Sequence, residues 1–445
     1  MAITPPRCVT FVRRRLCADA LHTLVHRAFR GIPDQRDAGT RIPLDDALMS
    51  AFAMFSLKDP SLLAFDARRY EGNLTDLYGI HQVPSDTQMR EILDPVDPEQ
   101  LRPVFADVFR ELQRGKVLES LVFWDGCYLL LLDGTGYFSS QKIHCESCLQ
   151  KVNRITGEVT YHHQILGAAI AHPDHKEVIP LAPEAIIKQD GDNKNDCERN
   201  AAKRLLRKIR REHPRLKLIV VEDSLASNAP HVRELIAQRM HFILGAKPGD
   251  HPFLWKHVNA AFDEGRATVI SWYRGDVRCE ISFVNRLPLN ESNADLLVNF
   301  LQYAEYNAEG QRQKIFTWIT DIRIVHANAR LLVQGGRARW KIENETFNTL
   351  KNQGYHYEHN FGHGDQHLSV AFAMLMMLAF LVDQVQQLCC PLFQAVLQKV
   401  GSKRSLWEKL RSHVYHFIFR SMKQLYEAIL FDLCRHLPAP KFDSS

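Results

Sequence analysis

Two short apolar runs constrain the fold of this chain more than any other feature. Residues 128–132 read Tyr-Leu-Leu-Leu-Leu and residues 218–222 read Leu-Ile-Val-Val-Glu, and each run is followed directly by an aspartate, Asp133 or Asp223. Runs of this length that lack polar alternation are typical of strands buried on both faces. The chain is therefore expected to build a sheet that is covered on both sides.

The segments around these runs predict what covers the sheet. The expected strands are Tyr128–Leu132, Tyr137–Ile143, His163–Ala171, Lys217–Glu222 and Phe242–Leu244, and the expected helices are Asp196–Arg211 and His231–Arg239. Three strands, a helix, a strand, a helix and a strand make a mixed sheet flanked by helices. This order is that of an α/β fold of the ribonuclease-H-like type.

The chain has 445 residues, which is too long for one ordinary hydrophobic core, so several domains are expected. Helical spacing of apolar residues dominates the N-terminal part, where Ser85 or Asp86 could cap a short helix. Strand-like patterns occur at 268–273, 278–284 and 314–319, and a helix is expected over Ala338–Lys351. We expect a helical region at 1–118, a ribonuclease-H-like core at 119–249 and 326–400, a β-rich insertion at 250–325, and a helical region at 401–445.

Asp133, Asp223 and a third acid, Glu343, are candidate metal ligands. Acids at the ends of neighbouring buried strands emerge at one edge of a sheet and can converge on a divalent cation. Each acid also has a plainer explanation. Asp133-Gly134 is typical of a turn, Asp223 could cap a following helix, and Glu343 could form a surface ion pair with Arg339.

The charge of the chain is mildly basic at +5, and this total alone identifies no nucleic-acid partner. The basic residues are concentrated between Arg199 and Lys217, and they include Lys203, Arg204 and Arg207. Such a cluster predicts either a surface that contacts DNA phosphates or an ordinary solvated helix face.

The ten cysteines are scattered through the chain, which favours free thiols in a reducing compartment. One pair, Cys145 and Cys148, has the spacing of two zinc ligands, and His162 and His163 follow it. Cys145 and Cys148, together with His162 or else His163, are therefore a candidate structural zinc site, although a single C-x-x-C more often holds free thiols.

Three segments resemble the DDE transposases of bacterial insertion sequences, in the subgroup with a β-rich insertion between the second Asp and the Glu. They are Leu132-Asp133-Gly134-Thr135, Val221-Glu222-Asp223-Ser224 and residues 337–351 (Arg-Ala-Arg-Trp-Lys-Ile-Glu-Asn-Glu-Thr-Phe-Asn-Thr-Leu-Lys). The subgroup signature is a Tyr, an Arg, the catalytic Glu and a Lys along one helix. Arg339 and Glu343 match it. Gly336 stands at the Tyr position, and Lys351 follows Glu343 by eight residues instead of seven.

The resemblance implies a DNA transposase that binds terminal inverted repeats, cleaves strands and joins them to target DNA. Asp133, Asp223 and Glu343 would hold two Mg²⁺ ions, for which Mn²⁺ can substitute. Arg339 and Lys351 would bind phosphate. A homodimer on double-stranded DNA in the bacterial cytoplasm is expected, with residues 1–118 binding DNA or dimerising. The alternatives are a ribonuclease-H-like nuclease without joining activity and an inactive DNA-binding relative.

Other residues near Glu343 leave choices open. Glu345 is a second candidate for the catalytic acid, and Trp340 and Trp318 could stack on a displaced base or pack in the core. On one continuous helix the spacing of His356, His359, His363 and His367 would form a metal-binding stripe. Gly362 and Gly364 instead favour a loop that shapes the cleft edge or touches DNA. The apolar segment Leu368–Val382 has 15 residues, too few to span a bilayer, and predicts a buried helix and no membrane association.

Overall fold

The computed structural model describes residues 14–37, 39–188 and 195–433. Its strands form one sheet in the order β2-β3-β1-β5-β6-β10-β9-β8-β7, with β4 paired to β3. They are β1 Tyr128–Ser140, β2 Leu149–Val152, β3 Val159–Ala171, β4 Ile179–Ile186, β5 Leu218–Glu222, β6 His241–Gly245, β7 Thr268–Arg274, β8 Val277–Asn290, β9 Asn293–Tyr306 and β10 Arg312–Thr320. Strands β1, β5 and β6 are parallel neighbours, and the other pairs are antiparallel. This mixed α/β sheet confirms the expected fold class and is consistent with a ribonuclease-H-like core.

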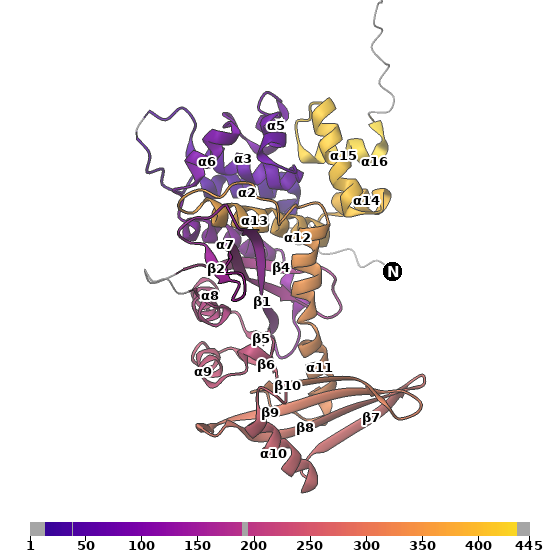
Figure 1. Cartoon of the computed structure of the whole chain (residues 1–445). Helices are drawn as coiled ribbons and strands as arrows, with labels where there is room; N and C mark the ends of the chain where they lie inside the picture. Colours follow the sequence, from indigo (N-terminus) through magenta and orange to yellow (C-terminus); the bar gives the residue numbers. More distant parts are fainter. Residues whose placement is uncertain (1–13, 38, 189–194, 434–445) are drawn as a thin grey trace, which may run out of the picture.

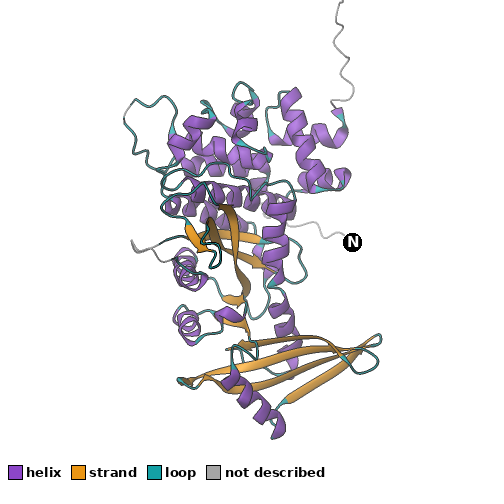
Figure 2. Cartoon of the chain, viewed as in Figure 1, coloured by secondary structure: helices purple, strands orange, loops and turns teal. Residues whose placement is uncertain are grey.

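Helices precede, flank and follow the sheet (Figures 1 and 2). They are η1 Arg14–Leu16, α2 Ala18–Phe29, α3 Leu44–Leu57, α4 Leu62–Asp66, α5 Asn73–Tyr78, α6 Asp86–Leu93, η2 Pro98–Leu101, α7 Arg102–Arg114, η3 Leu118–Leu121, α8 Glu198–Glu212, η4 Ser224–Ala226, α9 Ala229–Ala237, α10 Pro252–Asp263, α11 His326–Arg337, η5 Ile342–Phe347, α12 Asn348–Asn352, α13 Leu368–Cys389, α14 Pro391–Val400, α15 Lys403–His416 and α16 Met422–Phe431. The helical N- and C-terminal regions are thus confirmed.

Strand β1 is longer than the sequence suggested. The two separate strands expected at 128–132 and 137–143 are one strand, because β3 pairs with β1 on both sides of Asp133. Asp133 lies opposite Gly167, so it is not at a strand end and the turn interpretation of Asp133-Gly134 is wrong. The parallel partner β5 does end beside it, at Glu222. Asp133 therefore lies where the parallel pairing of β1 stops.

Helix α13 is the central helix of the protein. It has 22 residues, which is long and apolar enough to cross a membrane, yet the apolar segment is wholly buried inside the protein. It contacts α3 from the N-terminal region, β4 from the sheet and α14 from the C-terminal region. It extends beyond the expected end at Val382 because the polar residues that follow have buried partners, such as the Gln384 side chain, which accepts from the Val178 amide. It is the core helix of a soluble protein.

The antiparallel strands β7–β10 extend the central sheet at the end opposite the terminal helices (Figure 1). They fall between Asp223 and Glu343 in the sequence. Strand β10 joins them to the core by pairing with β6, from Trp318 opposite Gly245 to Thr320 opposite Ile243. Helix α10 packs against β8. The β-like patterns at 268–273, 278–284 and 314–319 are thus strands of one extension.

Candidate active site

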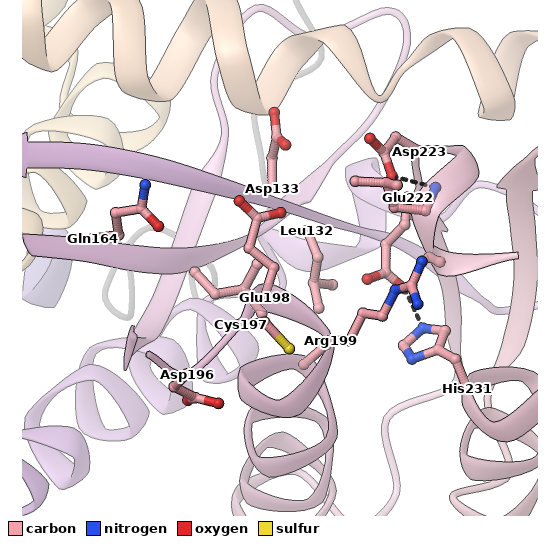
Figure 3. Close-up of a pocket in the computed structure, with 14 residues that line it drawn as sticks. Leu132, Asp133, Gln164, Asp196, Cys197, Glu198, Arg199, Glu222, Asp223 and His231 are labelled. Carbon is pink, nitrogen blue, oxygen red and sulfur yellow. Dashed lines mark hydrogen bonds and ion pairs between the residues drawn. The ribbon is translucent and has the colours of Figure 1, made fainter. Parts of the chain in front are cut away.

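Asp133 and Asp223 come from neighbouring parallel strands. The parallel pairing places Leu131 opposite Val221. Asp133 and Asp223 each follow these residues by two positions, so they lie at the same level of the sheet. Their carboxylates point to the same side in Figure 3. One oxygen of Asp223 accepts from the Leu225 amide at 2.9 Å, which caps the short turn η4. The capping interpretation of Asp223 is therefore correct, but the cap does not move Asp223 away from Asp133.

A close backbone contact holds Asp223 in place. A Cβ atom added at Gly245 of β6 would lie 3.0 Å from the Ser224 nitrogen and 3.2 Å from the Asp223 carbonyl carbon. Only a glycine allows this approach without a backbone shift. The preceding residue, Glu222, is already engaged, since its carboxylate bonds the buried His231 imidazole at 2.6 Å.

Glu343 lies on η5, which is a π-helical segment and not the regular α-helix expected at 338–351. The segment contacts β1 and β3. Its Phe347 ring packs on Gly167, the β3 residue opposite Asp133, where a Cβ atom would come within 2.8 Å of the ring. This contact brings the helical segment that carries Glu343 over the strands that carry the aspartates.

The charges of the three acids interact. Burial raises the pKa of Asp133, Arg339 opposes this, and the charges of Glu343 and Asp223 raise it further. The charge of Glu345 acts on a different group, Lys403 of α15. Burial lowers the pKa of Lys403, and the negative charge of Glu345 is one of the charges that raise it. Of the two candidate glutamates, Glu343 is thus the one whose charge raises the Asp133 pKa.

Arg339 binds Asp133, with 3.2 Å between its Nη1 atom and the carboxylate Oδ2 atom. The neighbouring Trp340 is about half exposed and lies near the Arg339 guanidinium, 5.1 Å from ring centroid to Cζ. Trp318 is different because it is buried in β10, so it belongs to the core. Its ring lies against Gly336, where a Cβ atom would come within 2.5 Å. A tyrosine at position 336 would collide with this ring.

The π-helical segment explains the unusual spacing of Lys351. A π-turn is closed by an i to i+5 hydrogen bond and contains one residue more than an α-turn. One π-turn between Glu343 and Lys351 therefore absorbs the extra residue, so that eight residues here correspond to seven residues of regular helix. Lys351 binds Glu358 at 2.9 Å across a partly exposed surface.

A cavity of about 470 Å³ opens beside Asp133 and Asp223 (Figure 3). Its wall includes Glu198, the first residue of α8. Burial and the charges of Asp133 and Asp223 raise the pKa of Glu198. Sequence patterns alone do not single out Glu198, because its only signal is an acidic residue in the first turn of a basic helix.

The match to a protein-family model decides the identity of the chain. The model described as "Transposase DDE domain" matches residues 156–381, about half of the chain. The chain belongs to the DDE transposase family. It is therefore a phosphoryl-transfer enzyme that acts on DNA, in a family that typically uses divalent metal ions. The match includes Asp223 and Glu343, whereas Asp133 precedes it. No curated protein matches the chain.

The basic residues of α8 are largely engaged inside the transposase. Arg204 binds Glu184 and Asp196, both at 2.7 Å, and Arg207 binds Glu234 at 2.6 Å. Lys203 is half-buried on the same helix. The positive charge of this stretch is therefore partly neutralised by neighbouring carboxylates.

The two predicted cysteine ligands meet, and of the two candidate histidines His163 joins them and His162 does not. Cys145 and Cys148 lie together, but His162 is absent from their cluster. His163 takes that position because neighbouring residues of a strand point to opposite faces. The segment that follows α12 adds His363, and it is a loop, as its glycines suggested.

Proposed function

We propose that this transposase binds the terminal inverted repeats of a mobile element, cleaves the DNA strand and joins the freed 3′-hydroxyl to target DNA. Asp133, Asp223 and Glu343 would hold two Mg²⁺ ions. The observation that supports this most is the electrostatic coupling of the three acids, since the charges of Asp223 and Glu343 both act on Asp133 from other elements.

The donor set suits this metal. Mg²⁺ prefers hard carboxylate oxygens and keeps water in its remaining positions, and Mn²⁺ accepts the same ligands. The raised pKa of the partly buried Asp133 indicates that its negative charge is not fully compensated, even with Arg339 beside it. When bound, the metal ions would activate the attacking hydroxyl and stabilise the leaving oxygen.

The basic residues near the acids would bind the DNA backbone. Arg339 contacts Asp133 at 3.2 Å, so it would exchange this carboxylate for a phosphate as DNA enters. Lys351 would bind a second phosphate, and the exposed Trp340 would contact a base. Lys203 would extend this surface along α8. Arg204 and Arg207 already hold carboxylates, so their contribution would be smaller.

We assign the chain to the subgroup with a β-rich insertion, formed here by residues 250–325. The supporting observation is that β7–β10 occur between Asp223 and Glu343. Residues 119–249 and 326–400 would form the catalytic core, and residues 401–445 would form a C-terminal helical region. Residues 1–118 would bind DNA or dimerise. Pairing of two element ends implies at least a homodimer, acting in the bacterial cytoplasm on chromosomal or plasmid DNA and away from membranes.

The test uses a labelled DNA fragment that carries the element's own terminal repeat, with Mg²⁺ and a target plasmid. Glu343→Gln removes the proposed ligand, and Glu345→Gln is the matched control two residues away on the same segment. We expect cleavage and joining by the parent and by Glu345→Gln, and loss of both products with Glu343→Gln.

Each other result has a definite meaning. Cleavage without joined product by the parent would favour a nuclease. DNA binding without cleavage by the parent would favour an inactive relative. Loss of cleavage in Glu345→Gln but not in Glu343→Gln would move the catalytic acid to Glu345.

A further inference from the structure

Four side chains from three distant segments form a compact cluster away from the acids. Cys145 and Cys148 come from the turn between β1 and β2, His163 from β3, and His363 from the loop between α12 and α13. Their four donor atoms all lie within 4.8 Å of one another. Cys148 and His163 are almost wholly buried, while Cys145 and His363 are half-buried.

The distances inside the cluster match those around a tetrahedral zinc ion. Bonds of about 2.3 Å to sulfur and about 2.0 Å to nitrogen, spread at tetrahedral angles, separate two sulfurs by about 3.8 Å and a sulfur from a nitrogen by about 3.5 Å. The Cys145 and Cys148 sulfurs are 3.8 Å apart. The His163 Nε2 atom is 3.4 Å from each sulfur, and the His363 Nε2 atom is 3.3 Å from the Cys148 sulfur.

The surroundings of the cluster also fit a metal. The Nδ1 atoms of His163 and His363 are buried and have no hydrogen-bond partner among the described residues. The polar contacts of both rings are therefore made by their Nε2 atoms, and these contacts are to cysteine sulfur. Nε2 is thus the nitrogen of each ring that is free to bind a metal. The Phe138 ring packs on the His363 ring at 4.5 Å between centroids, which limits access of water.

We propose that Cys145, Cys148, His163 and His363 bind one structural Zn²⁺ ion. Thiolate and imidazole are the ligands that zinc prefers, and four protein ligands leave no open position for catalysis. The site would join the β1–β2 turn to the loop that runs from the Glu343 segment to α13. Zinc would therefore fix the turn that follows the Asp133 strand to the loop that follows the Glu343 segment. It would take no part in the chemistry.

The test measures metal in the full-length protein, purified under reducing conditions without added zinc. We expect about one zinc per chain by mass spectrometry in the parent. His163→Ala and His162→Ala are a matched pair of neighbouring histidines, of which only the first should lose the metal. Glu343→Gln should keep it, which separates this site from the proposed Mg²⁺ site and makes the result independent of transposition.

A second readout does not depend on the folding of variants. When Co²⁺ replaces zinc in the parent, tetrahedral coordination by two thiolates gives intense visible bands and a sulfur-to-cobalt charge-transfer band. We expect both bands. A reduced, folded parent that holds no zinc and gives neither band would overturn the proposal. Zinc content in a folded His163→Ala equal to that of the parent would overturn it as well, as would a disulfide between Cys145 and Cys148 in the purified protein.

Discussion

Replacing Lys58 by methionine tests whether the N-terminal helices are structurally inseparable from the rest of the transposase. Lys58 follows α3, is fully buried, and binds Asp383 of α13 at 2.5 Å. The Tyr355 hydroxyl donates to the same carboxylate oxygen at 2.6 Å. The Trp407 ring from α15 lies 3.8 Å from the Lys58 ammonium. One ion pair thus joins the N-terminal, central and C-terminal parts of the chain.

The expected loss of stability follows from burial. Removing one partner of a buried ion pair leaves an uncompensated charge and costs about 3–5 kcal/mol. Methionine retains most of the length of lysine, so little of this cost comes from lost packing. The double variant Lys58→Met/Asp383→Leu removes both charges and leaves the Tyr355 hydroxyl without its acceptor, which costs about 1–3 kcal/mol. The double variant should therefore be more stable than Lys58→Met alone.

Urea unfolding followed by tryptophan fluorescence measures both variants, because Trp407 lies beside the altered side chain. Lys423→Met is the control, since Lys423 makes an exposed pair with Glu427 at 3.7 Å, and such pairs contribute less than about 1 kcal/mol. The reasoning would be refuted if Lys58→Met unfolded within about 1 kcal/mol of the control. A double variant no more stable than Lys58→Met alone would refute it as well.

Three further predictions concern the active site. Gly167→Ala should displace η5 and lower metal-dependent cleavage at least about tenfold, whereas Gly136→Ala, with no atom nearer than 3.8 Å to the new Cβ, should cleave normally. Burial lowers the pKa of His231, but the charge and hydrogen bond of Glu222 outweigh burial, so the net pKa is raised. The Glu222–His231 pair should therefore stabilise the fold fully below about pH 6.5 and less as pH rises through the raised pKa. Thermal melts across pH should show this slope in the parent and not in His231→Asn. Glu198→Gln should weaken Mn²⁺ binding measured by paramagnetic relaxation, and unchanged affinity would remove Glu198 from the site.

The parts of the fold that depend on local pattern could be predicted. The apolar run before Asp223 is a buried strand, and Ser85 caps α6 with its side chain as expected. Strand β9 was missed because Asn299 interrupts its apolar pattern. That amide is buried and satisfied by Ile322 and Arg286, and partners so far along the chain are invisible in a short window.

The parts of the site that depend on one residue of register could not be predicted. The choice between His162 and His163 rests on which face of β3 each histidine occupies, and the C-x-x-C spacing does not specify that face. The position of Lys351 rests on the π-turn in η5, which regular helical spacing does not include. His363 lies 215 residues from Cys148, so only tertiary structure brings it to the cysteines.

The pairing of β10 with β6 has a mechanical consequence. The three residue pairs from Trp318 to Thr320 join the outer strands to the central ones. Gly245, which touches the backbone of Asp223, is part of this seam. A force applied to β7–β9 by a bound macromolecule would therefore reach the backbone of a candidate metal ligand through β10 and β6.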